Sequence, residues 1–224
     1  MASEQNPLEC RRCGDCCRAG GPALHRRDKE LLASGGLLYR HLVTLRAGER
    51  VTDNVAGGIR VLGREMVKIR GRAGGAACVL FDEWAKACRL HPARPAECAA
   101  LFCGDDTALR QMYEKDRLVR ADLIHDPGLL DLAREHEARF AWSRVAELAA
   151  AAEGRREAAE ELLEMVKGDE AARERWVRES RDPREAAFVL GRPLSEGLPG
   201  FGIRVLQGPS GPVLALDRSL VPGR

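Results

Sequence analysis

The second half of the chain carries apolar residues at helical spacing. Within residues 127–154 they recur every three or four positions, and Asp126 precedes this stretch as a suitable N-cap with proline after it. We therefore predict a helix here, ended by the glycine at its close. Its apolar positions are Ala141, Val145, Leu148 and Ala152.

Three further helices and a hairpin are predicted beyond this point. One helix covers residues 156–168, and a second starts after Asp169 and carries Trp176. A third begins at Asp182, which is followed by proline and, three positions on, by glutamate in the form of a capping box. Residues 201–217 place two apolar runs around a Gly-Pro-Ser-Gly turn, which predicts a β-hairpin.

The first part of the chain is irregular and rich in glycine. Residues 26–36 predict one short helix that stops at a glycine pair. Residues 57–71 predict a hairpin with its tight turn at Gly63 and Arg64. A short strand is expected over residues 77–81.

These patterns predict an α+β fold with two parts. Residues 1–126 are expected to form a small, irregular cysteine-cluster domain with short hairpins, stabilised by metal. Residues 127–224 are expected to form an α-helical extension that ends in a β-hairpin. Nothing in the helical part marks chemistry, so it is expected to be a scaffold or an interaction surface for a protein partner.

Composition narrows the class of protein. The chain has 224 residues, 45% of them hydrophobic and 31% charged, with a net charge of +2. Arginine supplies 31 of the 36 basic residues and is interleaved with acidic ones, so no nucleic-acid surface is predicted. No signal peptide is visible, and no apolar run approaches the about 20 residues that cross a bilayer. We expect a soluble, cytoplasmic protein without a membrane contact.

The cysteines carry the chemistry of this sequence. All eight lie between residues 10 and 103, and four of them fall within CRRCGDCC, residues 10–17. A reducing compartment disfavours disulfides, so thiols this crowded are expected to be metal ligands. The predicted ligands are Cys10, Cys13, Cys16, Cys17, Cys78, Cys88, Cys98 and Cys103.

Spacing brings three of the first four thiols together. Two overlapping C-x2-C knuckles share Cys13, and Gly14 can take the positive φ that such a knuckle often needs. Cys17 is expected to point elsewhere, either closing the same site after a sharp bend or serving a second metal.

The later cysteines are predicted to lie around a short helix that begins near Pro95. Cys98 is then expected in its first turn, where free N–H groups favour a thiolate. Cys103 can reach the same site only if the helix ends at about Phe102 to Gly104. Either each group of four closes its own site, or the two groups interleave. The ligands suit zinc and an iron–sulfur cluster equally. Because apolar residues appear sparse here, loss of metal is expected to unfold this part.

The two motif halves together resemble a known family. CRRCGDCC, followed by two cysteines and then HPARPAEC and FC, is similar to the CxxCxxCC cysteine-cluster family, often labelled YkgJ-like. The resemblance covers residues 10–103 and departs at Leu90, His91 and Ala99, where the family usually has Ile, Tyr and Arg. It implies a zinc- or iron-chelating domain, and many members carry the label Fe–S oxidoreductase.

Other polar residues are weaker candidates. His91 is predicted to pack or to hydrogen-bond a thiolate in preference to binding metal, and Arg94 to offset thiolate charge or to fix the loop before Pro95. His125 and His136 are interpreted as structural. No catalytic residue is predicted, because no Ser/His/Asp arrangement, phosphate loop or carboxylate pair is present.

Three functions follow from these observations. The first is an iron–sulfur or zinc protein that acts as an oxidoreductase or electron carrier. The second is a zinc-stabilised module that binds a protein partner without catalysis. The third is a thiol redox sensor that uses Cys16 or Cys17.

Overall fold

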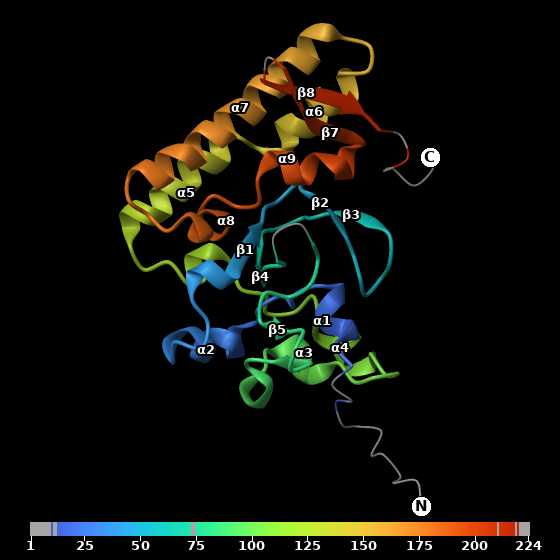
Figure 1. The fold of residues 1–224 in the computed structure, drawn as a ribbon, viewed down its shortest axis with the longest axis vertical. Helices are drawn as coiled ribbons and strands as arrows, with labels where there is room; N and C mark the ends of the chain where they lie inside the picture. Colours follow the sequence, from blue (N-terminus) through green and yellow to red (C-terminus); the bar gives the residue numbers. More distant parts are fainter. Residues whose placement is uncertain (1–9, 11–12, 73–74, 210, 218, 220–224) are drawn as a thin grey trace, which may run out of the picture. The chain divides into compact units, whose positions relative to one another are not determined.

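The chain forms two compact units in the computed structural model, which describes residues 10, 13–72, 75–209, 211–217 and 219. Unit 1 comprises Met1–Val43 and Met66–Leu123, and unit 2 comprises Thr44–Glu65 and Ile124–Arg224. Helices and short antiparallel strands are mixed, so the α+β class is confirmed (Figure 1). The domain boundary after residue 126 stays a prediction.

Unit 1 is built from short elements joined by turns. Its helices and strands are α1 (Asp15–Ala19), α2 (Lys29–Ala33), β4 (Met66–Ile69), β5 (Phe81–Asp82), β6 (Ala87–Cys88), α3 (Ala96–Ala100) and α4 (Thr107–Met112). Short 3-10 turns lie between them at Arg26–Asp28, Tyr39–His41, His91–Ala93 and Arg120–Asp122. The short helix predicted over 26–36 is confirmed, whereas the predicted strand over 77–81 is reduced to its last residue.

Unit 1 has an apolar core of its own. Leu24, Leu37, Val67 and Leu118 are at most 1% exposed. Backbone hydrogen bonds join these same segments, since Leu24 N–H donates to Val67 O and Leu118 N–H donates to Leu24 O. Unit 1 therefore buries more apolar residues than the sequence pattern suggests, and its unfolding on loss of metal stays a prediction.

The hairpin predicted over residues 57–71 is wrong in its pairing. β3 (Ile59–Val61) pairs instead with the preceding β2 (Arg50–Thr52), with Ile59 opposite Thr52. The reason is a stronger turn before β3, where the Asp53 carboxylate accepts hydrogen bonds from two backbone N–H groups. β4 pairs with β1 (Leu42–Leu45).

Unit 2 contains the long helices. They are α5 (Pro127–Arg139), α6 (Trp142–Ala151) and α7 (Arg156–Arg178), followed by the short α8 (Ala186–Val189) and α9 (Leu194–Gly197). Asp126 caps α5 as predicted, since its side chain accepts from Leu129 N–H at 3.2 Å. The single helix predicted over 127–154 is broken at Phe140, where the φ,ψ pair of −120°, 47° is not helical.

α7 is one helix where two were predicted. It runs through Gly168 and Asp169 without interruption. A Cβ on Gly168 would lie 2.9 Å from the Phe140 ring, so glycine is present here to let the ring approach the helix. The helix end that the sequence predicts at Gly168 is therefore wrong, because this glycine serves packing.

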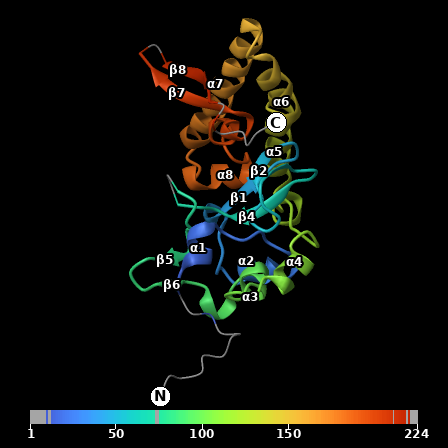
Figure 2. The same ribbon diagram turned by 90° about the vertical axis from the view of Figure 1, so that its right-hand side faces the viewer.

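The predicted tail hairpin is confirmed. β7 (Ile203–Gly208) pairs in register with β8 (Gly211–Leu216), and Figures 1 and 2 show this hairpin beside α7. One core cluster joins it to the helices: Phe140, Trp142, Val145, Leu148, Ala158, Leu162, Val166, Leu194, Leu198 and Ile203. Among the helices of the described residues, none combines the length and the apolar character needed to cross a membrane.

Candidate metal centre

The first cysteine knuckle is shaped by Gly14. This buried residue has φ +84°, as the sequence predicted, and a Cβ in its place would lie 2.3 Å from the Phe81 ring. The chain then turns into α1, because Arg18 N–H donates to Gly14 O at 2.8 Å. α1 carries Cys16 and Cys17 as neighbours, so their side chains leave the helix in different directions.

Cys17 lies beside the second group of cysteines. Cys78 N–H donates to Cys17 O at 2.7 Å, which joins the two segments directly. Cys88 is brought to the same place by the β5–β6 hairpin, since it is paired with Phe81, whose N–H donates to Cys78 O. The two cysteine motifs thus meet at Cys17, Cys78 and Cys88.

Cys98 is held there by α3, which a buried polar network fixes at its start. The Asp28 carboxylate accepts from Ala96 N–H at 2.9 Å and from His25 N–H at 2.8 Å. Glu97 accepts from Ala23 N–H at 2.8 Å and lies 3.2 Å from His25 Nε2. These contacts set the position of the helix that carries Cys98.

Sequence reasoning missed this network. His25 and Asp28 lie 72 and 69 positions before Glu97 and share no motif with it, so only their contacts in the folded chain reveal the role. α3 ends at Ala100, earlier than predicted, and Cys103 is exposed in the turn after it.

The thiols influence one another's protonation. Burial, followed by the neighbouring Cys16, raises the pKa of Cys17 to about 12, and Cys88 and Cys78 contribute to the same rise. Burial also raises the pKa of Cys98, with Cys78, Cys88, Cys16 and Cys17 adding to it. Burial thus has a larger effect on the pKa of Cys98 than the helix start, and its role as a thiolate ligand stays a prediction.

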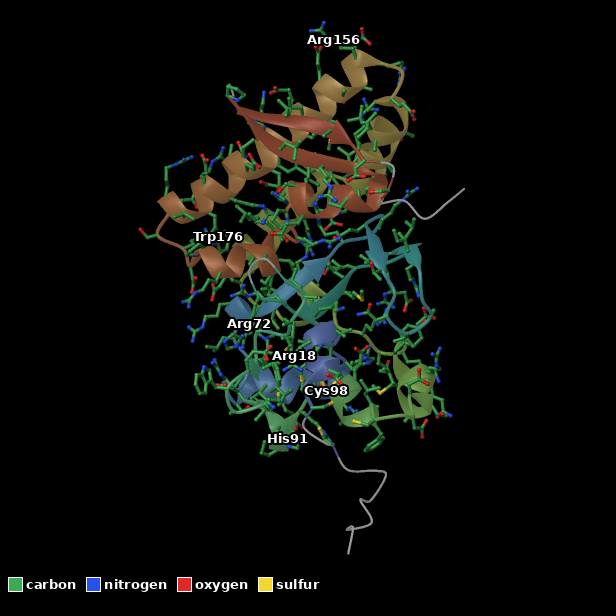
Figure 3. All side chains as sticks on the ribbon, turned by 45° about the vertical axis from the view of Figure 1, so that its right-hand side comes forward. Arg18, Arg72, His91, Cys98, Arg156 and Trp176 are labelled. Atoms are coloured by element: carbon green, nitrogen blue, oxygen red, sulfur yellow. The ribbon has the colours of Figure 1, made fainter. Side chains whose placement is uncertain are left out.

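Cys16 belongs to the same neighbourhood as the later thiols. It contributes to the raised pKa of both Cys17 and Cys98, and burial is again the main cause of the raised pKa of Cys78. The pKa of Cys16 is raised by burial and, less strongly, by Cys10 and Cys13. Figure 3 draws several sulfur atoms in the neighbourhood of Cys98.

The thiols share a neighbourhood but are not arranged as a coordination shell. Within the described ranges, no three His, Cys, Asp or Glu side chains stand at the spacing that holds a metal. All eight cysteines are free thiols. Their chemistry fits zinc or iron, since a coordinating cation removes the proton and relieves the repulsion among crowded thiolates.

Two arginines lie next to the thiols. Arg18 donates to Cys13 O at 3.0 Å and to Glu83 at 2.8 Å, and its guanidinium lies 5.1 Å from the centre of the Phe81 ring. Arg72 donates to Phe81 O, and its charge lowers the pKa of Cys78 against the larger effect of burial. Their positive charge favours thiolates, and Figure 3 labels both.

The other predicted residues are placed as follows. His91 begins a short 3-10 turn, and both His91 and Arg94 are half-buried. Their roles beside the thiols stay predictions. His136 lies in unit 2 as a buried residue bonded to Asp169, and His125 is exposed.

Thiols from separate segments that lie in one neighbourhood indicate a metal–thiolate class of protein. Residues 9–115 match the family model CxxCxxCC, described as "Putative zinc- or iron-chelating domain". This match confirms the resemblance of these residues to the family and supports zinc or iron as the cofactor. No curated protein and no solved structure matches the chain.

Proposed function

We propose that the CxxCxxCC domain binds iron as an iron–sulfur centre and that the protein carries electrons. The observation that carries the proposal is that thiols from separate segments meet: Cys78 N–H donates to Cys17 O, and the β5–β6 hairpin brings Cys88 to the same place. When bound, such a centre exchanges single electrons at a potential set by charge and hydrogen bonding around its sulfurs.

The ligand sets interleave in this proposal. Cys17 leaves the first motif and joins Cys78, Cys88 and Cys98, while the second set is Cys10, Cys13, Cys16 and Cys103. Cys16 and Cys17 are adjacent in α1, so the two sets are neighbours. Three members of the second set, Cys13, Cys16 and Cys103, are exposed, which gives a partner protein access to that set.

The residues around the thiols have separate tasks. Gly14 lets the first knuckle approach Phe81, Asp28 and Glu97 fix α3, and Arg18 and Arg72 offset part of the thiolate charge. The cytoplasmic location expected from the sequence suits this chemistry, because thiols stay reduced there. A protein partner at the helical extension belongs to the same proposal.

Absorption spectroscopy of protein purified without oxygen tests the electron-carrier role. We expect a broad band near about 400 nm that bleaches with dithionite and returns on reoxidation. A band that does not respond to reductant, or a colourless protein with zinc, contradicts the proposal.

Paired Cys→Ser variants test the interleaving. If Cys17 and Cys98 share one centre, Cys17→Ser with Cys98→Ser removes no more metal than either single variant. Cys13→Ser with Cys17→Ser then removes both centres. The opposite pattern shows that each motif closes its own site.

Structural zinc is the second candidate. Four protein thiolates per set would leave no coordination position open, which is typical of a structural zinc site. In that case the domain is a binding module, and the metal is expected to be redox-silent and stoichiometric.

A further inference from the structure

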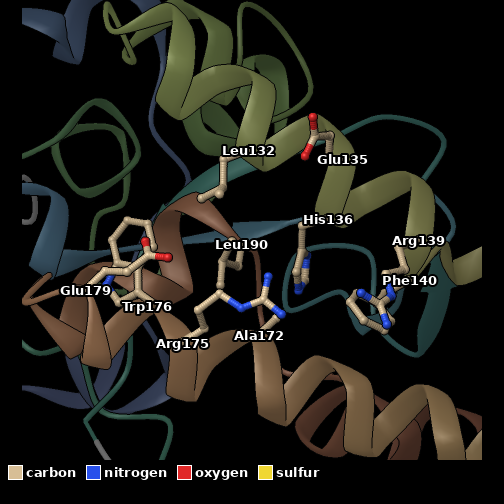
Figure 4. Close-up of a pocket in the computed structure, with 10 residues that line it drawn as sticks. All are labelled: Leu132, Glu135, His136, Arg139, Phe140, Ala172, Arg175, Trp176, Glu179 and Leu190. Carbon is tan, nitrogen blue, oxygen red and sulfur yellow. The ribbon is translucent and has the colours of Figure 1, made fainter.

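Unit 2 contains a cavity that the metal chemistry does not use. It has a volume of about 150 Å³ and lies among α5, α7 and the residue that follows α8 (Figure 4). Apolar side chains form much of its wall: Leu132, Phe140, Ala172, Trp176 and Leu190. The volume suits a ligand with a small branched or ring-shaped apolar part.

His136 gives this cavity a polar group. Its side chain is 4% exposed, and its Nε2 lies 2.9 Å from the Asp169 carboxylate. Burial lowers the pKa of His136 and outweighs the hydrogen bond to Asp169, which raises it. Burial would raise the pKa of Asp169, but the hydrogen bonds from His136 and Arg173 outweigh it and lower this pKa to about 2. At neutral pH the carboxylate is therefore charged and the imidazole neutral.

The hydrogen bond to Asp169 fixes the tautomer of His136. Nε2 carries the proton and donates it, so Nδ1 holds a lone pair and accepts. Within the described residues, Nδ1 is buried and has no hydrogen-bond partner. A buried acceptor without a partner favours a ligand that brings an O–H or N–H donor.

The polar rim supplies charge. Arg139 and Arg175 line the cavity and are exposed, and Figure 4 shows Arg175 extending in the direction of His136. The carboxylate of Glu179 lies 3.4 Å from Arg181, whereas Glu135 provides a negative charge at the rim. Trp176 presents its ring and not its N–H, because Nε1 donates to Asp182 O at 2.7 Å.

We propose that this cavity binds a small carboxylate that carries a hydroxyl or ammonium group on its α-carbon and a branched apolar side chain. The donor of the ligand bonds to His136 Nδ1, the carboxylate pairs with Arg175, and the apolar part contacts Leu132 and Trp176. Arg175 recognises the carboxylate through charge-assisted hydrogen bonds. Glu135 favours the ammonium form of the ligand.

Four probes of similar size test this assignment by titration calorimetry on the full chain. α-Hydroxyisovalerate and valine carry the carboxylate, a donor on the α-carbon and the branched apolar side chain. α-Ketoisovalerate lacks the donor on the α-carbon, and isobutanol lacks the carboxylate. We expect saturable binding of at least one of the first two, and at least about tenfold weaker binding of the last two. Which of the first two binds more tightly identifies the donor.

Two variants and one control complete the test. Arg175→Gln is expected to weaken binding by about tenfold or more, whereas Arg178→Gln, on α7 outside the cavity, leaves it unchanged. His136→Gln keeps a donor for Asp169 but removes Nδ1, so it is expected to abolish the preference for α-hydroxyisovalerate over α-ketoisovalerate.

Three results would overturn the proposal. The first is no saturation by either full probe at about 10 mM, and the second is equal binding of all four probes. The third is an equal loss in the two arginine variants. Since Arg175 is exposed, its substitution decides the matter even if the His136 variant does not fold.

Discussion

Unit 1 and unit 2 reach a stable interior by different routes. Unit 2 buries the faces of long helices, and one cluster extends from α6 through α7 to β7. Unit 1 uses helices of five or six residues, which are too short to be stable alone. Its short elements are fixed by contacts between distant segments, so its structure depends more on individual polar groups.

In each unit a buried aspartate organises its surroundings. Asp28 in unit 1 accepts two backbone N–H groups, and burial raises its pKa. Asp169 in unit 2 accepts from His136, Arg173 and Leu194 N–H, and its pKa falls to about 2. The two pKa values move in opposite directions because Asp28 accepts from backbone N–H groups, whereas Asp169 also accepts from the Arg173 guanidinium and the His136 imidazole.

Removing the carboxylate of Asp169 is expected to have the largest effect on stability. Asp169→Ala leaves Arg173, His136 and Leu194 N–H without their acceptor, so we expect a loss of about 3–5 kcal/mol in the free energy of unfolding. Urea denaturation followed by circular dichroism measures it. Asp131→Ala, an exposed partner of Arg134, is the control, and a similar loss there would contradict this account.

Removing Asp28 is expected to cost less and to act on the metal centre. Asp28→Ala leaves the N–H groups of His25 and Ala96 without acceptors, which we expect to cost about 2–4 kcal/mol. Because α3 then loses its anchor, metal bound through Cys98 should be released at lower chelator concentration. Asp15→Ala, on an exposed side chain of α1, should leave both quantities unchanged; unchanged chelator sensitivity in Asp28→Ala would argue against the role of α3.

A pair of glycines separates steric contact from backbone conformation. Gly14→Ala is expected to cost about 2 kcal/mol or more, because it combines a positive φ with a contact against Phe81. Gly35 has φ +76° and open space around it, so Gly35→Ala should show only the backbone cost of about 1 kcal/mol. Equal losses of unfolding free energy in the two variants would mean that Phe81 moves aside freely.

The pH response of unit 2 is expected to be the smallest of these effects. The pKa of His136 is lowered, first by burial and then by the charges of Arg46 and Arg173, although Asp169 opposes this. The folded state therefore disfavours protonation, and stability is full above about pH 6.5 and is lost as the pH falls through the lowered pKa. Denaturation of wild type and His136→Gln from neutral to mildly acidic pH isolates this part, which should be absent in the variant; parallel curves would refute it.

The same comparison explains what the sequence could predict. In unit 2 the helical period, the cap at Asp126 and the tail hairpin follow from local patterns, and all three are observed. The break at Phe140 and the continuity through Gly168 depend on packing between helices, which no local pattern contains.

In unit 1 the sequence indicates that the ligands are thiols but not which thiols lie beside one another. Spacing identified eight candidate thiols and the positive φ of Gly14. It could not predict that Cys17 lies beside Cys78, because this depends on one backbone hydrogen bond between distant segments. Nor could it reveal the roles of Asp28 and Glu97, because these side chains accept hydrogen bonds from segments that are distant in the sequence.

Metal analysis of the full chain, purified without oxygen, tests the central claim most directly. Mass spectrometry of the dissolved elements should find iron with matching acid-labile sulfide, and Cys17→Ser should lower the iron content as Cys98→Ser does. Zinc at a stoichiometric level without sulfide would assign the second candidate. A chain with neither metal would contradict the account of the cysteine cluster.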